Sequence, residues 1–557
     1  MDKALEMGKS SATGSFHLLI GVVGSTVIMA VGTLVLAGLL QVNELGLYGI
    51  ALIPSSIINF FRDWGVNYAM TQQIASLRAA GKDSEIHDVI VSGIIFEIIS
   101  GLILSLICFA VAEPLALILS PSNAANLSVY ISIMSLSIFA GAILAAAGAI
   151  FTGFERMKLN SFTQIFQAIV KTALGPFLIV LGFGVFGAIY AAMGSILAGG
   201  AIGILIVYFS LFRPLRKCKV GKCDVKRTLK PMLKYGLPLT VSSILVGVLP
   251  QVFAFSMAIY AGEWMMGNYY AAAYFSVLLT FVSFPIATAL FPVFSKLNPE
   301  KEPELVKTVF ASSVKYTAVL LVPATMILIT LATPLVNTLF PKNGIMESLF
   351  VVAEPKFPYA PLFLAVSSII NLFVLVGNIS LGTFQTGIGK TNQVMKQSVL
   401  SLAVGLPLAY LLVSYFASIG GPSFAVIGGI IGTLIASAPG IVWGLYWIWK
   451  NYRVKADFRV SAKIFAASAI ASAVTYLFIN IFSLAYWMTL AAGFVVFLLV
   501  YLATAPLLGA VNQMDIENFR AMFSGLGVVS KVLNVPLLFM RKMCKGNSAK
   551  KVLAAGN

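Results

Sequence analysis

The sequence predicts an all-α polytopic membrane protein with about fourteen transmembrane helices, and three observations carry this prediction. Of the 557 residues, 59% are hydrophobic and only 10% are charged, whereas about 25% are charged in an average soluble protein. Long apolar runs recur along the whole chain, and Lys and Arg gather in alternate connections between them. This composition excludes a water-soluble globule, whose surface needs more charge, and a disordered chain, whose composition is far more polar.

Each predicted span is a run of about 20 mostly apolar residues, the length that a helix needs to cross the hydrocarbon core. The second run is the weakest prediction, because it contains Arg62 and Asp63. The first run is long enough to span and follows a polar N-terminus, so we expect no cleavable signal peptide. The runs are roughly 16–40, 45–70, 87–111, 128–153, 161–182, 185–211, 235–261, 267–294, 309–330, 359–382, 393–416, 422–448, 460–482 and 486–508.

The basic residues predict how these spans are oriented. If the N-terminus is cytoplasmic, the inside segments hold all of the 37 Lys and Arg residues except Lys171, Lys342 and Lys356. Cytoplasmic loops are enriched in Lys and Arg, so we expect a multi-pass protein of the cell membrane with both termini in the cytoplasm. The net charge of +17 then reflects topology and contact with anionic membrane lipids, and no nucleic-acid partner is expected.

Two stretches of the chain share the same spacing. Residues 16–77 and 235–297 each begin with a long apolar run and reach a glutamate 28 residues later, at Glu44 and Glu263. This repeat predicts two parallel six-helix halves, a plan typical of secondary transporters. The predicted segments are an N-terminal six-helix bundle (1–212), a basic cytoplasmic linker (213–234), a C-terminal six-helix bundle (235–450), two additional transmembrane helices (451–510) and a basic amphipathic cytoplasmic tail (511–557).

Three short motifs add to this plan: FFRDWGVNYAMTQQIASL at residues 60–77, GFER at 153–156 and LFPVFSKL at 290–297. With them, the chain resembles the multidrug/oligosaccharidyl-lipid/polysaccharide (MOP) exporter superfamily, and within it the prokaryotic Wzx-like polysaccharide-biosynthesis flippases. The resemblance implies a V of two helical bundles around a central cavity. It also implies alternating-access transport of a polyprenyl-pyrophosphate-linked oligosaccharide from the inner to the outer leaflet, coupled to H⁺ or Na⁺.

The resemblance further implies a monomer that needs no cofactor and works with glycan-assembly enzymes. Lipid II flippases of the same superfamily line their cavity with arginines, several of them on the first helix. The first run of this chain, 16–40, carries no charge, which argues against a peptidoglycan precursor as the substrate.

Two charged residues are predicted to lie near the membrane midplane. Glu97 and Lys171 each stand about ten residues from the inner end of a span, which corresponds to a depth of about 15 Å. Ionisable groups at such depth are functional by default. We expect them to face a cavity and to pair in at least one state of the transporter, where Glu97 takes up H⁺ or Na⁺ and Lys171 is released to a substrate phosphate. A static buried ion pair, or Lys171 snorkelling to the interface, stays open as the alternative.

Arg62 and Asp63 form a second charged candidate. If their helix continues to Leu77, they lie in its inner half with Asn67 one turn further on. Arg62 would then bind pyrophosphate through its forked donors, and Asp63 would contribute to ion coupling. The alternative is an interfacial Arg–Asp pair in which Asp63 caps a break in the helix.

The remaining candidates are a gate and a set of amides. Glu155 and Arg156 lie on an inner loop, either as a gate salt bridge or as solvated residues. Amides within spans suit sugar hydroxyls, or else hydrogen-bond one helix to another. Asn371 and Asn378 are seven residues apart, so on one continuous helix they share a face. The substrate-binding amides are predicted to be Asn67, Gln164, Gln167, Gln251, Asn371 and Asn378.

Two other functions compete with the flippase. The first is a cation-coupled exporter of small amphipathic, multidrug-type substrates in the same superfamily, which prefers a more acidic cavity than Arg62 and Lys171 would give. The second is a membrane-embedded enzyme. The largest predicted outer loop, 331–358, holds only Glu347 and Glu354 as acids and no histidine. The chain also has no phosphate-binding G-x-x-x-x-G-K-[ST] motif, and we expect no catalytic residues and no metal site.

Overall fold

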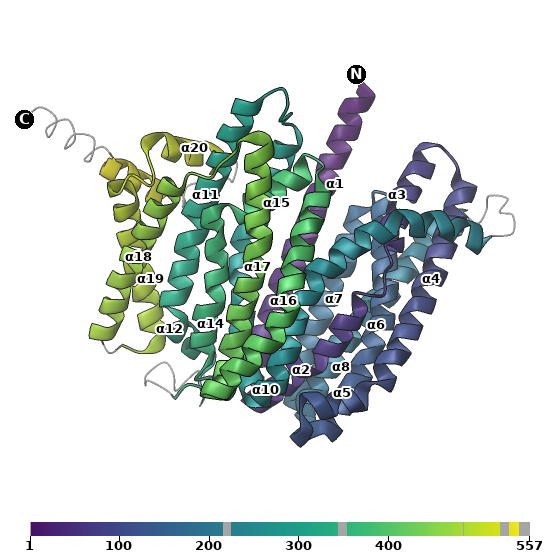
Figure 1. Cartoon of the computed structure of the whole chain (residues 1–557). Helices are drawn as coiled ribbons and strands as arrows, with labels where there is room; N and C mark the ends of the chain where they lie inside the picture. The colour runs from purple at the N-terminus through teal and green to yellow at the C-terminus, as the bar shows by residue number, and fades with distance from the viewer. Residues whose placement is uncertain (1, 216–223, 343–353, 483, 524–533, 545–557) are drawn as a thin grey trace, which may run out of the picture. The chain divides into compact units, whose positions relative to one another are not determined.

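The computed structural model describes residues 2–215, 224–342, 354–482, 484–523 and 534–544 (Figure 1). Within these ranges the backbone is helical apart from turns and one isolated β-bridge between Pro341 and Pro355. The all-α prediction is therefore confirmed. The helices of the first part are α1 (Asp2–Leu39), α2 (Val42–Asn59), α3 (Val66–Ala79), α4 (Asp83–Ala110), α5 (Ala112–Leu119), α6 (Ala124–Gly153), α7 (Met157–Leu178), α8 (Gly184–Ile206), α9 (Arg213–Leu215) and α10 (Val225–Ser295).

The later helices follow in the same manner, joined mostly by short turns. Short 3₁₀ segments at Pro121–Asn123 and Ile369–Val376 and π-helical turns at Ile179–Phe183 and Val207–Phe212 interrupt the regular α-helices. The later helices are α11 (Pro303–Thr330), α12 (Ala332–Leu339), α14 (Ala360–Ser368), α15 (Asn378–Gly387), α16 (Thr391–Gly420), α17 (Pro422–Tyr452), α18 (Phe458–Ile481), α19 (Tyr486–Leu507) and α20 (Gln513–Phe523).

Among the described residues, ten helical segments are long and apolar enough to cross a membrane, or eleven if one bent pair forms a single span. Two of them, Met157–Phe212 and Ser243–Ser295, hold 56 and 53 residues. At about 1.5 Å per residue each is about 80 Å long, more than twice the hydrocarbon core of about 30 Å. Each is also interrupted by a glycine with non-helical backbone, Gly182 or Gly262. The chain is a multi-pass membrane protein, while the number fourteen and the V-shaped arrangement stay predictions.

The chain forms two compact units. The first holds Met1–Tyr274 and Leu402–Ala436, and the second holds Phe275–Ser401 and Ser437–Asn557. The first unit thus contains α1–α9, most of α10 and parts of α16 and α17. These units are defined by contacts within the structure, whereas the predicted segments were defined by the sequence repeat. The predicted division into two six-helix bundles, a linker, two helices and a tail therefore stays a prediction.

Helix α1 lies along α7 in the first unit, and small residues bring the two backbones together. A methyl group at Gly32 would collide with the side chain of Thr172. The Thr172 hydroxyl donates a hydrogen bond to the Ile28 carbonyl at 3.0 Å. Small residues and interhelical hydrogen bonds are the usual means of helix association in lipid, where the hydrophobic effect is absent.

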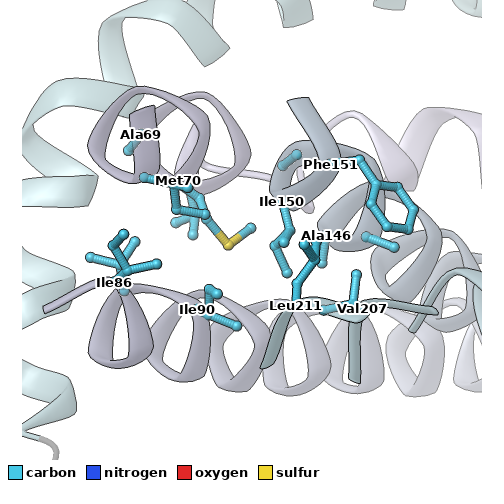
Figure 2. Close-up of a cluster of buried hydrophobic side chains, with 14 of the residues drawn as sticks. Ala69, Met70, Ile86, Ile90, Ala146, Ile150, Phe151, Val207 and Leu211 are labelled. Carbon is cyan, nitrogen blue, oxygen red and sulfur yellow. The ribbon is translucent and has the colours of Figure 1, made fainter. Parts of the chain in front are cut away.

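One buried apolar cluster of the first unit joins α3, α4, α6 and the π-helical turn that follows α8. Figure 2 shows the side chains of Met70, Ile86, Ile90, Ile150 and Leu211 gathered between these helices. The first four are fully buried. This packing holds α3 beside α4, which carries Glu97.

The second unit contains the antiparallel pair α18 and α19, which lie side by side (Figure 1). The Tyr501 hydroxyl of α19 donates to the Val319 carbonyl of α11 at 2.9 Å and ties the pair to that helix. A buried aromatic cluster that includes Phe294, Phe310 and Phe384 joins the end of α10 to α11 and α15.

The tail returns to α11 through α20. Lys315 Nζ lies 2.6 Å from Asp515 Oδ2, and Asn518 donates to the Tyr316 hydroxyl at 2.7 Å. Phe519 of α20 is buried, whereas Met514 of the same helix is 71% exposed. A place for the tail on the inner membrane surface stays a prediction, and residues 524–533 and 545–557 lie outside the described residues.

Candidate functional site

The second predicted span is not one continuous helix, so the condition that it continues to Leu77 is not met, and the alternative of a helix break capped by Asp63 describes this segment. Helix α2 ends at Asn59 and α3 begins at Val66. Gly65 has φ 78°, a left-handed conformation that glycine adopts without steric cost. The Asp63 carboxylate accepts the backbone N–H of Asn67 at 3.1 Å and caps α3. The break places Arg62 between two half-helices, an arrangement that recurs at transporter binding sites.

Arg62 is held by a buried polar network. Its Nε donates to Asn59 Oδ1 at 3.1 Å, and its Nη1 donates to the Glu97 carboxylate. Asn67 Nδ2 donates to Glu97 Oε1 at 2.9 Å. The side chains of Arg62 and Glu97 are only 7% and 1% exposed. In this structure Glu97 therefore pairs with Arg62 and not with Lys171, contrary to the pairing expected from depth alone.

A cavity of about 820 Å³ opens beside this network within the first unit. Its wall combines polar side chains from the α2–α3 break, from α3, from α6 and from the start of α7. Four predicted site residues line it: Arg62, Asp63, Asn67 and Gln164. The polar groups that sequence reasoning missed are Tyr68, Thr71, Gln72, Thr152, Asn160 and Tyr235.

A second hollow of about 320 Å³ lies next to the first and shares Asn59, Gly141 and Leu144 with it. It contains two further predicted residues, Gln167 and Lys171. We call the two hollows together the polar cavity. The additional hydroxyls on the wall of the second hollow belong to Tyr48, Ser55, Ser56, Ser137 and Ser195.

One face of α7 supplies the floor of the polar cavity. Asn160, Gln164, Gln167 and Lys171 follow one another at intervals of four, three and four residues, which places them on a single helical stripe. Gln164 Nε2 donates to Asn160 Oδ1 at 3.2 Å. Lys171 makes no ion pair with any part of the chain that the structure describes. The regular spacing was visible in the sequence and would have added Asn160 to the candidates.

The charges of the polar cavity almost cancel. Arg62 and Lys171 are cationic, Asp63 is the acid on the wall, and Glu97 lies behind Arg62. With Glu97 ionised the four charges sum to zero, whereas neutralising Glu97 leaves an excess of one positive charge. The surrounding amides and hydroxyls both donate and accept hydrogen bonds. Such a wall suits an anionic group joined to neutral polar groups such as sugar hydroxyls.

Three predicted amides do not line the polar cavity. Gln251 is half-buried on α10 and lines neither hollow. Asn371 and Asn378 belong to the second unit, and Gly377, with φ 87°, breaks the helix between them with a bend of 56°. The inference that these two asparagines share a face therefore fails, because it assumed one continuous helix.

The predicted gate residues lie in the turn between α6 and α7. Glu155 has a positive φ of 58° and its carboxylate lies 3.9 Å from Arg78 Nη1, with both side chains largely exposed. Arg156 is exposed and immediately precedes α7. A gating role for these two residues stays a prediction.

A close helix crossing in the first unit joins residues 42–49 of α2 to residues 263–270 of α10, and we call it the α2–α10 seam. A methyl group at Gly46 would collide with the Glu263 carbonyl, and one at Gly267 with the Val42 carbonyl. The backbones therefore touch, as small residues permit. The two segments come from the two predicted transport halves.

The Glu263 carboxylate extends this seam to the α5–α6 connection. One of its oxygens accepts from the Ser120 hydroxyl, from Asn123 Nδ2 at 3.0 Å and from the Ser122 hydroxyl at 3.3 Å. Sequence reasoning treated Glu263 only as a marker of the repeat. Its location beside a turn rich in Ser and Asn was not visible without the fold.

The second unit carries an apolar groove of about 420 Å³. Its wall is formed by the end of α10, by α11 and α19, and by side chains of the tail such as Phe519, Leu537 and Met540. Nearly all of the wall is hydrocarbon, so the groove suits an aliphatic chain. Among the described residues, no three His, Cys, Asp or Glu side chains are grouped so that they could hold a metal ion.

Comparisons with known proteins agree with this architecture. Residues 11–298, just over half of the chain, match the family described as polysaccharide biosynthesis protein. A probable lipid II flippase, MurJ of Synechocystis, is 25% identical over 321 residues, which cover 54% of this chain and 56% of that protein. The matched regions span 51% to 70% of the length of the curated relatives.

Two solved structures share the fold. A lipid II flippase MurJ in an inward closed conformation has a TM-score of 0.68 at 17% identity, and the match covers 88% of this chain and 97% of that one. An inward-facing multidrug resistance MATE family transporter has a TM-score of 0.63 at 19% identity, covering 78% and 98% of the two chains. At these identities the likeness shows the fold and not the substrate.

Proposed function

The chain belongs to the polysaccharide biosynthesis protein family of the MOP superfamily, and from that premise we propose that it flips a polyprenyl-pyrophosphate-linked oligosaccharide from the inner to the outer leaflet of the cell membrane. The observation that carries this proposal is the polar cavity, where Arg62 and Lys171 stand among amides and hydroxyls. Those cations would attract a pyrophosphate, and once Glu97 is neutralised the excess positive charge would also disfavour an organic cation. Operation as a monomer, cytoplasmic termini and cooperation with glycan-assembly enzymes are parts of the same proposal.

Arg62 and Lys171 are the proposed phosphate ligands. The planar guanidinium of Arg62 matches two phosphate oxygens at once, and the ammonium of Lys171 acts as a point charge. The α7 stripe from Asn160 to Lys171 is about 16 Å long at about 1.5 Å per residue. That length accommodates several sugar units beside the pyrophosphate, with the amide side chains hydrogen-bonding to hydroxyls.

Glu97 is the proposed coupling residue. As a carboxylate it binds Arg62 and keeps the four charges of the cavity balanced. Uptake of H⁺ or Na⁺ by Glu97 would weaken this pair and leave the cavity with one excess positive charge. An anionic head group would then find Arg62 available, which links ion uptake to substrate binding.

The α2–α10 seam is a proposed gate of the alternating-access cycle. The two helical segments of the seam come from different predicted halves. The seam therefore has to open when the halves separate. The hydrogen bonds from Ser120, Ser122 and Asn123 to Glu263 would hold the closed state.

Reconstituted vesicles test this function against the multidrug alternative. The wild-type chain is supplied either with a fluorescent polyprenyl-pyrophosphate oligosaccharide or with a fluorescent organic cation, with and without an imposed H⁺ or Na⁺ gradient. Flipping of the lipid-linked sugar that responds to a gradient in wild type, and no longer responds in Glu97→Gln, supports the proposal. Glu304→Gln is the matched control, since Glu304 is an exposed acid. Transport of the organic cation alone overturns the proposal in favour of the multidrug type.

A further inference from the structure

A ladder of exposed aromatic rings runs along α17 in the second unit. Trp443, Tyr446 and Trp449 are three residues apart and lie on one face of the helix, with exposed fractions of 37%, 47% and 38%. Successive ring centroids are 6.2 Å apart. Trp and Tyr favour the membrane–water interface, where the ring meets hydrocarbon and the polar edge meets head groups.

Three cations are gathered at the C-terminal end of this ladder. Lys450 Nζ lies 5.9 Å from the centroid of Tyr446, while Arg453 Cζ and Lys455 Nζ lie 5.3 and 5.8 Å from the centroid of Trp449. These distances are within the range of cation–π attraction. The indole ring of Trp449 therefore contacts two cations, and the third cation, Lys450, is the next residue in the chain after Trp449.

The backbone holds the cations in this arrangement. Arg453 ends the helix with a positive φ of 55°, and its N–H donates to the Trp449 carbonyl at 3.0 Å. Val454 and Ala456 are buried in the aromatic cluster around Phe294, which anchors the short connection to α18. Arg453 and Lys455, which alternate with these buried residues, are thereby left exposed on the side of Trp449.

The neighbouring acids do not neutralise these charges. Asp457 uses its carboxylate to cap α18, accepting the N–H groups of Arg459 and Val460 at 3.0 and 3.2 Å. Neither Asp457 nor Glu300, which lies near Tyr452, makes an ion pair with the three cations in the part of the chain that the structure describes. Three positive charges thus converge without a counterion among the described residues.

We propose that Lys450, Arg453 and Lys455, together with the ring of Trp449, form a binding site for the phosphate of an anionic phospholipid in the inner leaflet. The three positive charges complement a phosphodiester. The exposed aromatic ladder extends from them along α17, where the acyl chains of that lipid would run. The predicted topology places this end of α17 on the cytoplasmic side, where anionic lipids attract basic residues. This site is separate from the polar cavity and does not depend on the proposed substrate.

Native mass spectrometry of the full-length chain in mild detergent tests the site. The protein is incubated with phosphatidylglycerol or with phosphatidylcholine of the same acyl chains, and the retained lipids are counted. Wild type should retain phosphatidylglycerol, and retention should fall about tenfold in the triple variant Lys450→Gln/Arg453→Gln/Lys455→Gln. Trp449→Leu keeps every charge and should give an intermediate loss, because two cations lose their ring.

The matched control is Lys226→Gln/Arg227→Gln/Lys230→Gln, which removes three exposed cations of α10 that contact no ring among the described residues. It should retain phosphatidylglycerol as wild type does. An equal loss in this control would show a response to total charge and overturn the proposal. Equal retention of phosphatidylcholine would overturn it too, as would displacement of the lipid by inorganic pyrophosphate or preferential retention of a polyprenyl pyrophosphate.

Discussion

Arg62 and Glu97 form an ion pair that is almost completely withdrawn from solvent, with 7% and 1% of their side chains exposed. The pair joins the break between α2 and α3 to the middle of α4. Because a buried charge is costly without its partner, each residue constrains the other. In the proposed mechanism Glu97 takes up the coupling ion, and Arg62 is the partner that this uptake releases.

The first prediction concerns the stability of this pair. Glu97→Ala leaves Arg62 buried and unpaired, which should lower the free energy of unfolding by about 3–5 kcal/mol. Glu304→Ala, at an exposed acid paired with Lys307, should cost less than about 1 kcal/mol. Thermal unfolding in detergent measures both. The double variant Arg62→Ala/Glu97→Ala should be less destabilised than the sum of the single variants, and strict additivity would contradict direct coupling.

The second prediction concerns the close approach at the α2–α10 seam. Gly46→Ala introduces a methyl group where the Glu263 carbonyl already lies, so it should destabilise the chain by about 1–3 kcal/mol. Gly382→Ala is the control, because no atom lies within 4 Å of its added methyl group. That control should be neutral or slightly stabilising. Equal unfolding temperatures for the two variants would count against backbone contact at the seam.

The third prediction concerns the hydrogen bonds that close the seam. In a background without the four native cysteines, Ser120→Cys and Glu263→Cys should be joined by a short bis-methanethiosulfonate cross-linker, because the Ser120 hydroxyl contacts the Glu263 carboxylate and a cysteine is shorter than the glutamate that it replaces. The cross-link should stop transport and a reductant should restore it. Each single-cysteine variant, treated in the same way, serves as the control. Undiminished transport by the fully cross-linked protein would show that the seam does not open.

The fourth prediction concerns the tail. Asp515 binds Lys315 Nζ and also accepts the Asn512 N–H at 2.7 Å, so it both docks α20 and caps it. Asp515→Ala should weaken docking by about 1–3 kcal/mol, since the half-buried Lys315 ammonium and the Asn512 N–H lose their acceptor. Limited proteolysis with a C-terminal tag should then release the tail faster than in wild type. Glu517→Ala, at an exposed acid of the same helix, should leave the rate unchanged.

The repeat in the sequence located two glutamates but could not reveal that they act differently. Glu44 caps the N-terminus of its own helix, α2, because its carboxylate accepts the Gln41 N–H at 2.8 Å. Glu263 instead follows a break at Gly262 and reaches the α5–α6 connection. Equal spacing along two halves specifies equal depth in the membrane. The partner of each side chain depends on which helices pack around it.

The polar cavity was predicted only in part, because the sequence does not say which helices pack around each polar side chain. Apolar runs with isolated polar residues identify the side chains that lipid would not tolerate, and this reasoning found Arg62, Gln164, Gln167 and Lys171. Depth placed Glu97 and Lys171 at one level of the membrane. It gave no rotation about the helix axis, so the partner that Glu97 has in this structure, Arg62 on the broken α2–α3 segment, was not predicted.

Transport by variants at the proposed phosphate ligands tests the central claim most directly. Flipping of a fluorescent polyprenyl-pyrophosphate oligosaccharide in reconstituted vesicles is compared for wild type, Arg62→Ala, Lys171→Ala and the control Lys230→Ala, which removes an exposed cation of α10. Loss of one charge-assisted hydrogen bond should slow flipping about tenfold or more in the first two variants. The control should match wild type. Flipping at the wild-type rate by folded Arg62→Ala and Lys171→Ala proteins would contradict the assignment of the polar cavity as the phosphate site.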